Sequence, residues 1–167
     1  YMQIAYNTGN EARRLAAEVL KAGIESVNPN FQIQVVGMPW PVLLDARRSS
    51  KLPIYVGGWL EDFHDPHNWV HPFLHSQGAY GRVANIQEPL ASELDAMIAE
   101  AAGLTDQDAR RAIYEELQLI AQKEAPMIWM YQPLARVHQA PWIEGWYFNA
   151  AYPGSYSYVY ALDKVAP

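Results

Sequence analysis

The first part of the chain alternates between short apolar runs and segments in which apolar residues recur at helical spacing. Residues 2–6 and 31–37 have the pattern of short strands, and residues 53–59 form an apolar run that contains a pair of glycines. Between these strands, residues 11–26 and 42–49 show the apolar stripe of a helix. The order β-α-β-α-β is typical of a parallel sheet covered by helices, so an α/β fold is predicted.

The second part changes to longer helical patterns and then to an aromatic tail. A short helix is expected up to about residue 75, and residues 85–102 and 105–124 form a predicted helical hairpin. Residues 126–132 and 134–139 have the pattern of two strands separated by a proline turn. The tail beyond Pro141 reads as loop and strand, and it holds eight of the 21 aromatic residues: Trp142, Trp146, Tyr147, Phe148, Tyr152, Tyr156, Tyr158 and Tyr160. Such a segment needs a surface to bury it.

Composition and charge exclude several classes of function. The 167 residues include 12 Lys and Arg against 18 Asp and Glu, a net charge of −6, and residues 85–124 account for the imbalance as a solvated helical face. An acidic chain without clustered basic residues does not suit nucleic acid. The absence of cysteine excludes thiol catalysis, disulfides and thiolate metal sites. No apolar run is long enough to predict a membrane helix.

Motifs of common enzymes and cofactor sites are absent, so we expect no catalytic residues and no cofactor. Glu61, Asp62 and Asp65 contain possible carboxylate pairs for hydrolysis, but neighbouring side chains usually diverge. A metal-dependent hydrolase is the alternative from another class. It depends on a histidine cluster, whose last three members have helical i, i+4, i+8 spacing: His64, His67, His71 and His75. Pro72 argues against one unbroken helix that presents all three, and no metal site is expected.

Trp59 and Asp62 form a sharper candidate for ligand binding. Trp59 stands at the end of the third predicted strand, and Asp62 follows in a polar loop. In open α/β sheets, ligands bind outside the carboxyl ends of the strands. A tryptophan face can pack against a ligand, and a carboxylate can accept a hydrogen bond from an ammonium group. The same pattern also fits a core tryptophan and a capping aspartate.

The segment Gly58–Pro66, with the sequence GWLEDFHDP, resembles the Gly-Trp-x-x-Asp-x-x-Asp-Pro segment of extracytoplasmic solute-binding proteins that serve ABC importers. The similarity is to the peptide/nickel-binding family, which includes oligopeptide and dipeptide binders. It extends to Tyr6–Asn10 before the first helix, to the helix pattern of residues 85–101, and to the helix and strand pattern of residues 108–128.

The resemblance implies a periplasmic-binding-protein-like lobe, with a β-α-β-α-β sheet flanked by helices, a helical hairpin and aromatic C-terminal strands. Residues 1–140 would be the C-terminal ligand-binding lobe, and residues 141–167 would return to the protein's own N-terminal lobe. The strand-first start and the missing signal peptide fit a piece of a longer protein. The implied protein is extracytoplasmic, either periplasmic or lipid-anchored at the cell surface, with no membrane insertion of this segment.

The resemblance also implies roles for single residues. Trp59 would line the ligand cleft and Asp62 would hold the α-ammonium of a peptide, with Gly58, Glu61 and Trp40 beside them. No arginine for the ligand carboxylate stands in the first strand–helix loop, and Val56 occupies the position three residues before the tryptophan. The expected function is the binding of a short peptide between two lobes and its delivery to ABC permease subunits. A sugar, opine or nickel chelate is the alternative ligand.

Overall fold

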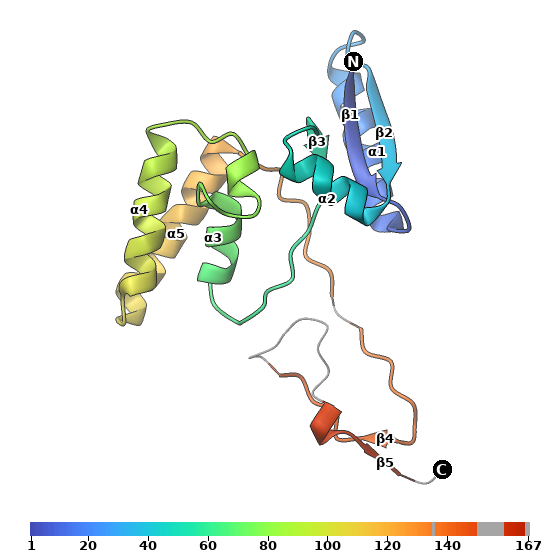
Figure 1. Cartoon of the computed structure of the whole chain (residues 1–167), viewed down its shortest axis with the longest axis vertical. Coiled ribbons are helices and arrows are strands. Elements are labelled where there is room, and N and C mark those ends of the chain that lie inside the picture. Colours follow the sequence, from blue (N-terminus) through green and yellow to red (C-terminus); the bar gives the residue numbers. More distant parts are fainter. Residues whose placement is uncertain (135, 150–158, 166–167) are drawn as a thin grey trace. The chain divides into compact units, whose positions relative to one another are not determined.

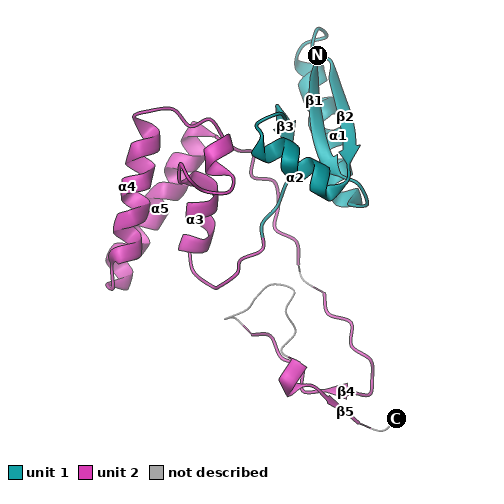
Figure 2. Cartoon of the chain, in the orientation of Figure 1, with its two compact units in different colours: residues 1–59 teal, residues 60–167 magenta. Residues whose placement is uncertain are grey.

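The computed structural model describes residues 1–134, 136–149 and 159–165. The chain divides into two compact units, residues 1–59 and residues 60–167 (Figure 2). Each unit is described by itself below. The expected boundary near residue 140, which concerns the lobes of a longer protein, stays a prediction.

Unit 1 is built on a parallel three-stranded sheet in the order β2-β1-β3 (Figure 1). The strands are β1 (Met2–Asn7), β2 (Ile33–Met38) and β3 (Ile54–Tyr55), with α1 (Glu11–Val27) and α2 (Trp40–Arg48) as the connections between them. Helix α1 packs against β1 and β2. The core of the unit contains the buried side chains of Ile4 in β1, Ala17 in α1, Ile33 in β2 and Val56 just after β3. The predicted β-α-β-α-β order is therefore confirmed.

The third strand is shorter than predicted. Ile54 and Tyr55 pair with Ile4 and Ala5, and the Val56 amide still donates to the Ala5 carbonyl oxygen at 2.8 Å. Beyond that bond the chain leaves the ladder at the glycine pair. Glycine has no side chain to pack against a neighbouring strand. The strand pairing therefore stops before the end of the apolar run.

Unit 2 contains a packed group of helices: α3 (His67–Leu74), the 3₁₀ turn η1 (Gly81–Val83), α4 (Leu90–Gly103) and α5 (Gln107–Glu124). Helices α4 and α5 run side by side as the predicted hairpin (Figure 1), and α3 packs against both. The helices pack together through buried side chains, which are Phe73, Leu74, Leu94, Ile98, Ala101, Tyr114, Leu117 and Ala121. Asp106 caps α5, because its Oδ1 accepts from the amides of Asp108 and Ala109 at 3.0 and 2.8 Å.

Helix α4 begins later than predicted from the sequence. The expected start was residue 85, whereas the helix starts at Leu90, directly after Pro89. A proline restricts the residue before it to extended backbone, and Asn85 has a φ of 56°. These local constraints place the start of the helix after residue 85.

The two strands predicted over residues 126–139 are wrong for the described part of that range, which has no regular secondary structure. Ile128, Trp129 and Tyr131 have the residue types of a strand, yet they are exposed. A strand also needs a neighbouring ladder, and the described residues supply none there. The tail contains β4 (Ile143–Glu144) paired antiparallel with β5 (Asp163–Lys164), and the 3₁₀ turn η2 (Val159–Ala161). Tyr152, Tyr156 and Tyr158 lie outside the described residues.

Within the described ranges, no helix combines the length and the apolar character required to cross a lipid bilayer.

The hairpin core provides a test of unit 2. Leu117 is 0% exposed in α5, and Leu119 on the same helix is 65% exposed. We expect Leu117→Ala to lower the free energy of unfolding by about 2–5 kcal/mol, because it leaves a cavity among close-packed side chains. Leu119→Ala, the matched control, changes it by less than about 0.5 kcal/mol. Urea unfolding followed by circular dichroism measures both, and equal effects would contradict this packing.

Candidate ligand-binding site

In unit 1, an arginine lies at the carboxyl edge of the sheet. Arg13 is in the first turn of α1, and its Nη1 donates to the Asn7 Oδ1 at the end of β1, at 2.8 Å. Its Cζ lies 5.5 Å from the centroid of the Trp40 ring, which follows β2. A Cβ at Gly58 would lie 3.0 Å from the Arg13 Nη2, so glycine leaves room for the guanidinium. The structure thus brings the predicted residues Trp40 and Gly58 together around Arg13.

Arg13 was not predicted from the sequence, because the resemblance implies an arginine in the strand–helix loop or three residues before Trp59. One signal was present. The start of a helix carries a partial positive charge, so a cation in the first turn is unfavourable unless other contacts hold it. Asn10 caps the start of α1, because its Oδ1 accepts from the Arg13 amide at 3.0 Å. This cap places the Arg13 side chain beside the ends of the strands. Trp59, the last residue of unit 1, is half-buried.

In unit 2, the carboxylates that follow Trp59 have different environments. Glu61 is bonded internally, since its Oε2 accepts from the Trp69 Nε1 at 2.9 Å and its Oε1 lies 3.0 Å from the His64 Nδ1. Asp62 is exposed, and its amide donates to the Asn68 Oδ1 at 2.9 Å. Among the described residues, nothing forms a hydrogen bond or ion pair with the Asp62 carboxylate. The backbone is therefore anchored there while the carboxylate stays open to solvent.

Asp65 fixes the end of the same segment through Arg110 of α5. The guanidinium donates twice to the carboxylate, at 2.8 and 2.7 Å, and also to the Ala101 carbonyl at 3.0 Å and the Tyr114 hydroxyl at 3.1 Å. Asp65 in turn accepts from the His67 amide at 2.8 Å, at the start of α3. The hydrogen bonds from Arg110 hold the pKa of Asp65 below its ordinary value, although partial burial opposes them.

Three of the predicted histidines lie in a row along α3, and we call them the histidine stack: His67 and His71 in the helix, and His75 directly after it. The ring centroids of His67 and His71 are 5.2 Å apart, and those of His71 and His75 are 4.5 Å apart. The sequence predicted that no unbroken helix presents His67, His71 and His75, and α3 does end before His75, but Pro72 is not what ends it. Helix α3 continues through Pro72 to Leu74, because proline removes only one intrahelical bond and its ring is buried in the core. The rings face one another, and no group of three or more potential ligands among the described residues has a metal-binding arrangement.

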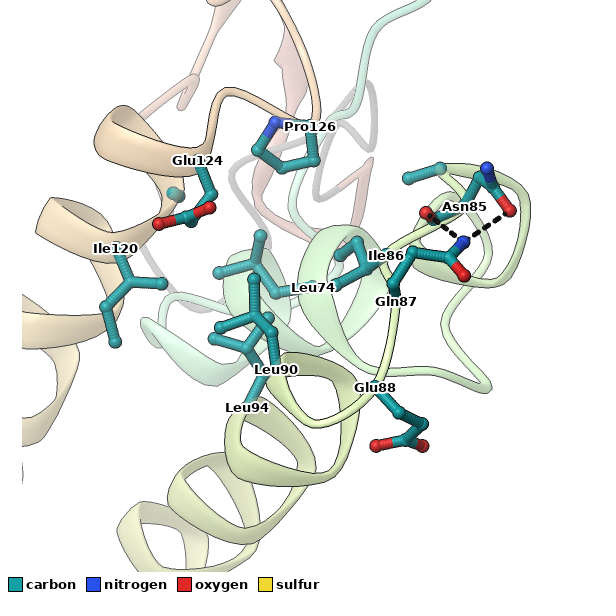
Figure 3. A pocket seen from close by; sticks show the side chains of 12 residues that line it. Leu74, Asn85, Ile86, Gln87, Glu88, Leu90, Leu94, Ile120, Glu124 and Pro126 are labelled. Carbon is teal, nitrogen blue, oxygen red and sulfur yellow. Dashed lines mark hydrogen bonds between the residues drawn. The ribbon is translucent and has the colours of Figure 1, made fainter.

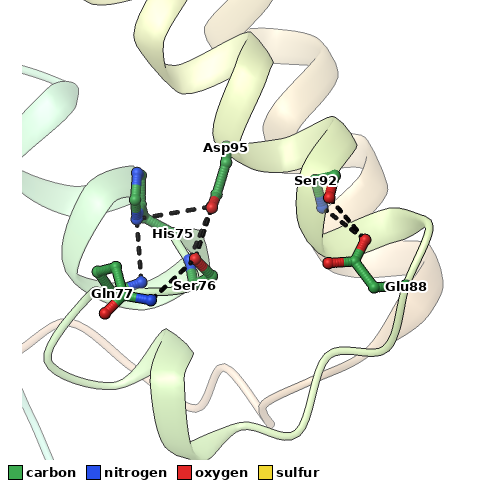
Figure 4. Close-up of polar contacts among 6 residues, drawn as sticks. All are labelled: His75, Ser76, Gln77, Glu88, Ser92 and Asp95. Atoms are coloured by element: carbon green, nitrogen blue, oxygen red, sulfur yellow. Dashed lines mark hydrogen bonds and ion pairs between the residues drawn. The ribbon is translucent and has the colours of Figure 1, made fainter.

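The end of the histidine stack is joined to α4 by Asp95 (Figure 4). The Asp95 carboxylate accepts from the Ser76 amide at 2.7 Å and from its hydroxyl at 2.5 Å. The His75 Nδ1 lies 3.5 Å from Asp95 but accepts from the Gln77 amide at 3.0 Å. In the neutral form of the ring, a nitrogen that accepts carries no proton, so the hydrogen of neutral His75 is on Nε2.

A separate pocket of about 360 Å³ lies in unit 2, between the segment before α4 and the C-terminal turns of α5 (Figure 3). Its floor is apolar, with Leu74, Leu90 and Ile120, and it contains none of the predicted site residues. Glu88 at its margin is bonded to Ser92, whose amide and hydroxyl donate at 3.2 and 2.7 Å (Figure 4).

A parallel sheet whose carboxyl edge carries an arginine and a tryptophan is an arrangement suited to a small ligand. Comparison with known proteins agrees. The chain is 21% identical to periplasmic oligopeptide-binding protein OppA of Escherichia coli, over 87% of the chain and 25% of that protein. It is 27% identical to heme-binding protein A of Haemophilus influenzae, over 84% of the chain and 24% of that protein. No protein-family model matches the chain.

The fold of the chain matches solved structures of the same class. The crystal structure of Haemophilus influenzae OppA in complex with the peptide RPPGFSPFR superposes with a TM-score of 0.76 at 18% identity, covering 99% of this chain and 31% of that one. The homologues of the chain are thus periplasmic peptide-binding proteins and their relatives, and the predicted resemblance, fold class and extracytoplasmic setting are confirmed. The chain spans about a quarter of the length of the curated relatives it matches.

The Asp65–Arg110 pair predicts a stability effect. We expect Arg110→Gln to lower the free energy of unfolding by about 2–3 kcal/mol, because the half-buried Asp65 carboxylate loses its charged partner. Arg111→Gln is the matched control, since Arg111 pairs with Asp108 in an exposed contact, with 64% and 87% of the two side chains accessible. Chemical unfolding at pH 7 compares the variants. If the Arg110 variant were as stable as the Arg111 variant, the pair would have no anchoring role.

The histidine stack predicts a pH effect. Burial lowers the pKa of His71 from its ordinary value of 6.5, and the charges of His75 and His67 lower it further, against Asp95. The unfolded chain then binds more protons below pH 6.5 than the folded one, so stability falls as pH drops from about 7 through 6.5 towards the folded pKa. Unfolding measured from pH 7 to 5 should show this slope, which His71→Gln reduces and the control His138→Gln keeps. A slope unchanged in His71→Gln contradicts this assignment.

Proposed function

We propose that this chain is the ligand-binding part of an extracytoplasmic solute-binding protein of an ABC importer. In this proposal the protein binds a short peptide between two lobes and delivers it to the permease subunits, without catalysis. The homology to periplasmic binding proteins supports this proposal, because the relatives include an oligopeptide-binding protein and a heme-binding protein. The stacked histidines give no support to the alternative, a metal-dependent hydrolase.

The observation that carries the proposal is the open carboxylate of Asp62. Glu61 and Asp65, its acidic neighbours in the segment, have internal partners, whereas Asp62 is exposed and unpartnered among the described residues. Its backbone is held by Asn68, so the carboxylate is positioned without being neutralised. An ammonium group is the natural complement of such a carboxylate, as it supplies both a positive charge and hydrogen-bond donors.

The remaining predicted residues support this role in different ways. Trp59 and Trp40 offer aromatic surface for a ligand, and Gly58 leaves space at the sheet edge. Glu61 is a supporting residue in this proposal, because its bond to the Trp69 indole holds the segment on α3. A heme-like or other non-peptide ligand is the second candidate, favoured by the identity to a heme-binding protein. Mass spectrometry of the co-purified ligand separates the two candidates.

The amine role of Asp62 is tested by calorimetry with the full-length protein and tri-alanine. We expect Asp62→Asn to weaken binding by about tenfold or more, because the charge-assisted bond to the ammonium is lost. N-acetyl-tri-alanine should bind both proteins equally weakly, since it has no ammonium to lose. Asp45→Asn, an exposed aspartate of α2, is the control and keeps full affinity. Undiminished tri-alanine affinity in Asp62→Asn would rule out the amine role.

A further inference from the structure

The polar side chains of the pocket in unit 2 are acidic or amide groups. Twelve of the described residues line this pocket; two of them are glutamates, Glu88 and Glu124, and none is a lysine, arginine or histidine. The glutamates stand on opposite sides of it, Glu124 in the last turn of α5 and Glu88 before α4 (Figure 3). Negative charge therefore flanks the pocket on both sides.

The neutral polar groups at the margin also leave acceptors for a ligand. The Gln87 Nε2 donates to the carbonyl oxygen and to the Oδ1 of Asn85, both at 2.9 Å. An amide nitrogen has only two hydrogens, so the Gln87 Oε1 is what remains for a ligand. Glu88 keeps an acceptor as well, because Ser92 donates to its Oε2 and leaves Oε1. These acceptors suit a ligand that brings its own N–H donors.

Glu124 has one weak partner, its neighbour in the chain. The Lys123 Nζ lies 3.4 Å from the Glu124 Oε1, and 82% and 43% of the two side chains are accessible. Water screens an exposed pair of this kind, so it contributes little, and a ligand cation can replace the lysine contact. The surroundings attract a cation too, because residues 85–124 contain nine acidic and three basic side chains.

The floor of the pocket suits an apolar body. Leu74 and Leu94 are 3% and 1% exposed, and Leu90 and Ile120 are half-buried. At about 360 Å³, the pocket has the volume of a small-molecule site, for which about 300–1,000 Å³ is typical. Moving apolar ligand surface from water onto this floor drives binding, and the carboxylates at the margin select the sign of the ligand's charge.

We propose that this pocket is a second binding site, which takes a small organic cation with an apolar body, such as an alkylammonium ion. The apolar body lies on Leu74, Leu90 and Ile120, and the ammonium group donates to Glu124 at the margin. This inference goes beyond the proposed peptide binding, since the pocket does not include Asp62 and needs no peptide. The same two glutamates repel a carboxylate or phosphate ligand.

The experiment titrates hexylammonium, 1-hexanol and hexanoate into the full-length protein, labelled with ¹³C at isoleucine and leucine methyl groups. We expect a saturable shift of the Ile120 signal, assigned with Ile120→Val, and an affinity for hexylammonium about tenfold or more above that for hexanoate. Glu124→Gln weakens hexylammonium binding by about three- to tenfold and leaves hexanol binding unchanged, which shows an intact pocket.

Glu116→Gln is the matched control, because Glu116 is an exposed glutamate of α5 that does not line the pocket. It keeps the wild-type affinity for hexylammonium. Equal affinities of the wild type for hexylammonium and hexanoate would overturn the proposal, and so would an unchanged hexylammonium affinity in Glu124→Gln.

A second measurement tests whether the pocket is open in the whole protein. A soluble nitroxide broadens the methyl signals that it can approach, so Ile120 should broaden and Leu117, which is 0% exposed, should not. If Ile120 stays sharp, or if its signal moves with protein concentration, another segment or a second copy fills the pocket and the proposal fails. Hexylammonium binding in a protein that does not bind tri-alanine would remove the peptide function and keep this site.

Discussion

The paired hydrogen bonds from Arg110 to Asp65 connect groups 45 residues apart, and much of unit 2 is organised around them. Through Asp65 they fix the start of α3, and through the Ala101 carbonyl they fix the end of α4. The segment that carries Asp62 is therefore held at its C-terminal end by a charge pair and at Asp62 itself by Asn68. An exposed carboxylate can have a defined position only because its neighbours on either side are bound.

A second constraint operates in unit 1. Parallel strands end at one edge of their sheet, so any polar residue placed just after them meets the others there. Arg13, Trp40 and Gly58 are distant in sequence and become neighbours by this rule. Both units hold candidate site residues in defined positions, but by different physical means. In unit 1 the strand direction brings the residues together, and in unit 2 the half-buried Asp65–Arg110 ion pair positions the segment that carries Asp62.

Local patterns predicted the β-α-β-α-β order of unit 1, the helices α1 and α5 and the helical hairpin, because these depend on periodicity and capping within short stretches. Local patterns did not predict the structure where it depends on a distant segment or on an adjacent proline. Residues 126–139 have strand chemistry without a ladder partner among the described residues, and α4 begins only after Pro89. The position of Arg13 at the sheet edge was not predicted, because it depends on where a long side chain reaches, which spacing does not encode. Asp62 was predicted through a resemblance, and its role in ligand binding stays a prediction. The structure adds that its acidic neighbours Glu61 and Asp65 are already engaged.

The histidine stack has a consequence for how the protein takes up protons. Three imidazoles follow one another with centroids about 5 Å apart, so a charge on one ring is felt by the next. His71 is the middle ring, and burial together with the charges of His75 and His67 lowers its pKa. A proton is therefore harder to place on the centre of the row than on an isolated imidazole in water. The middle of α3 thus resists becoming charged when the surroundings turn acidic.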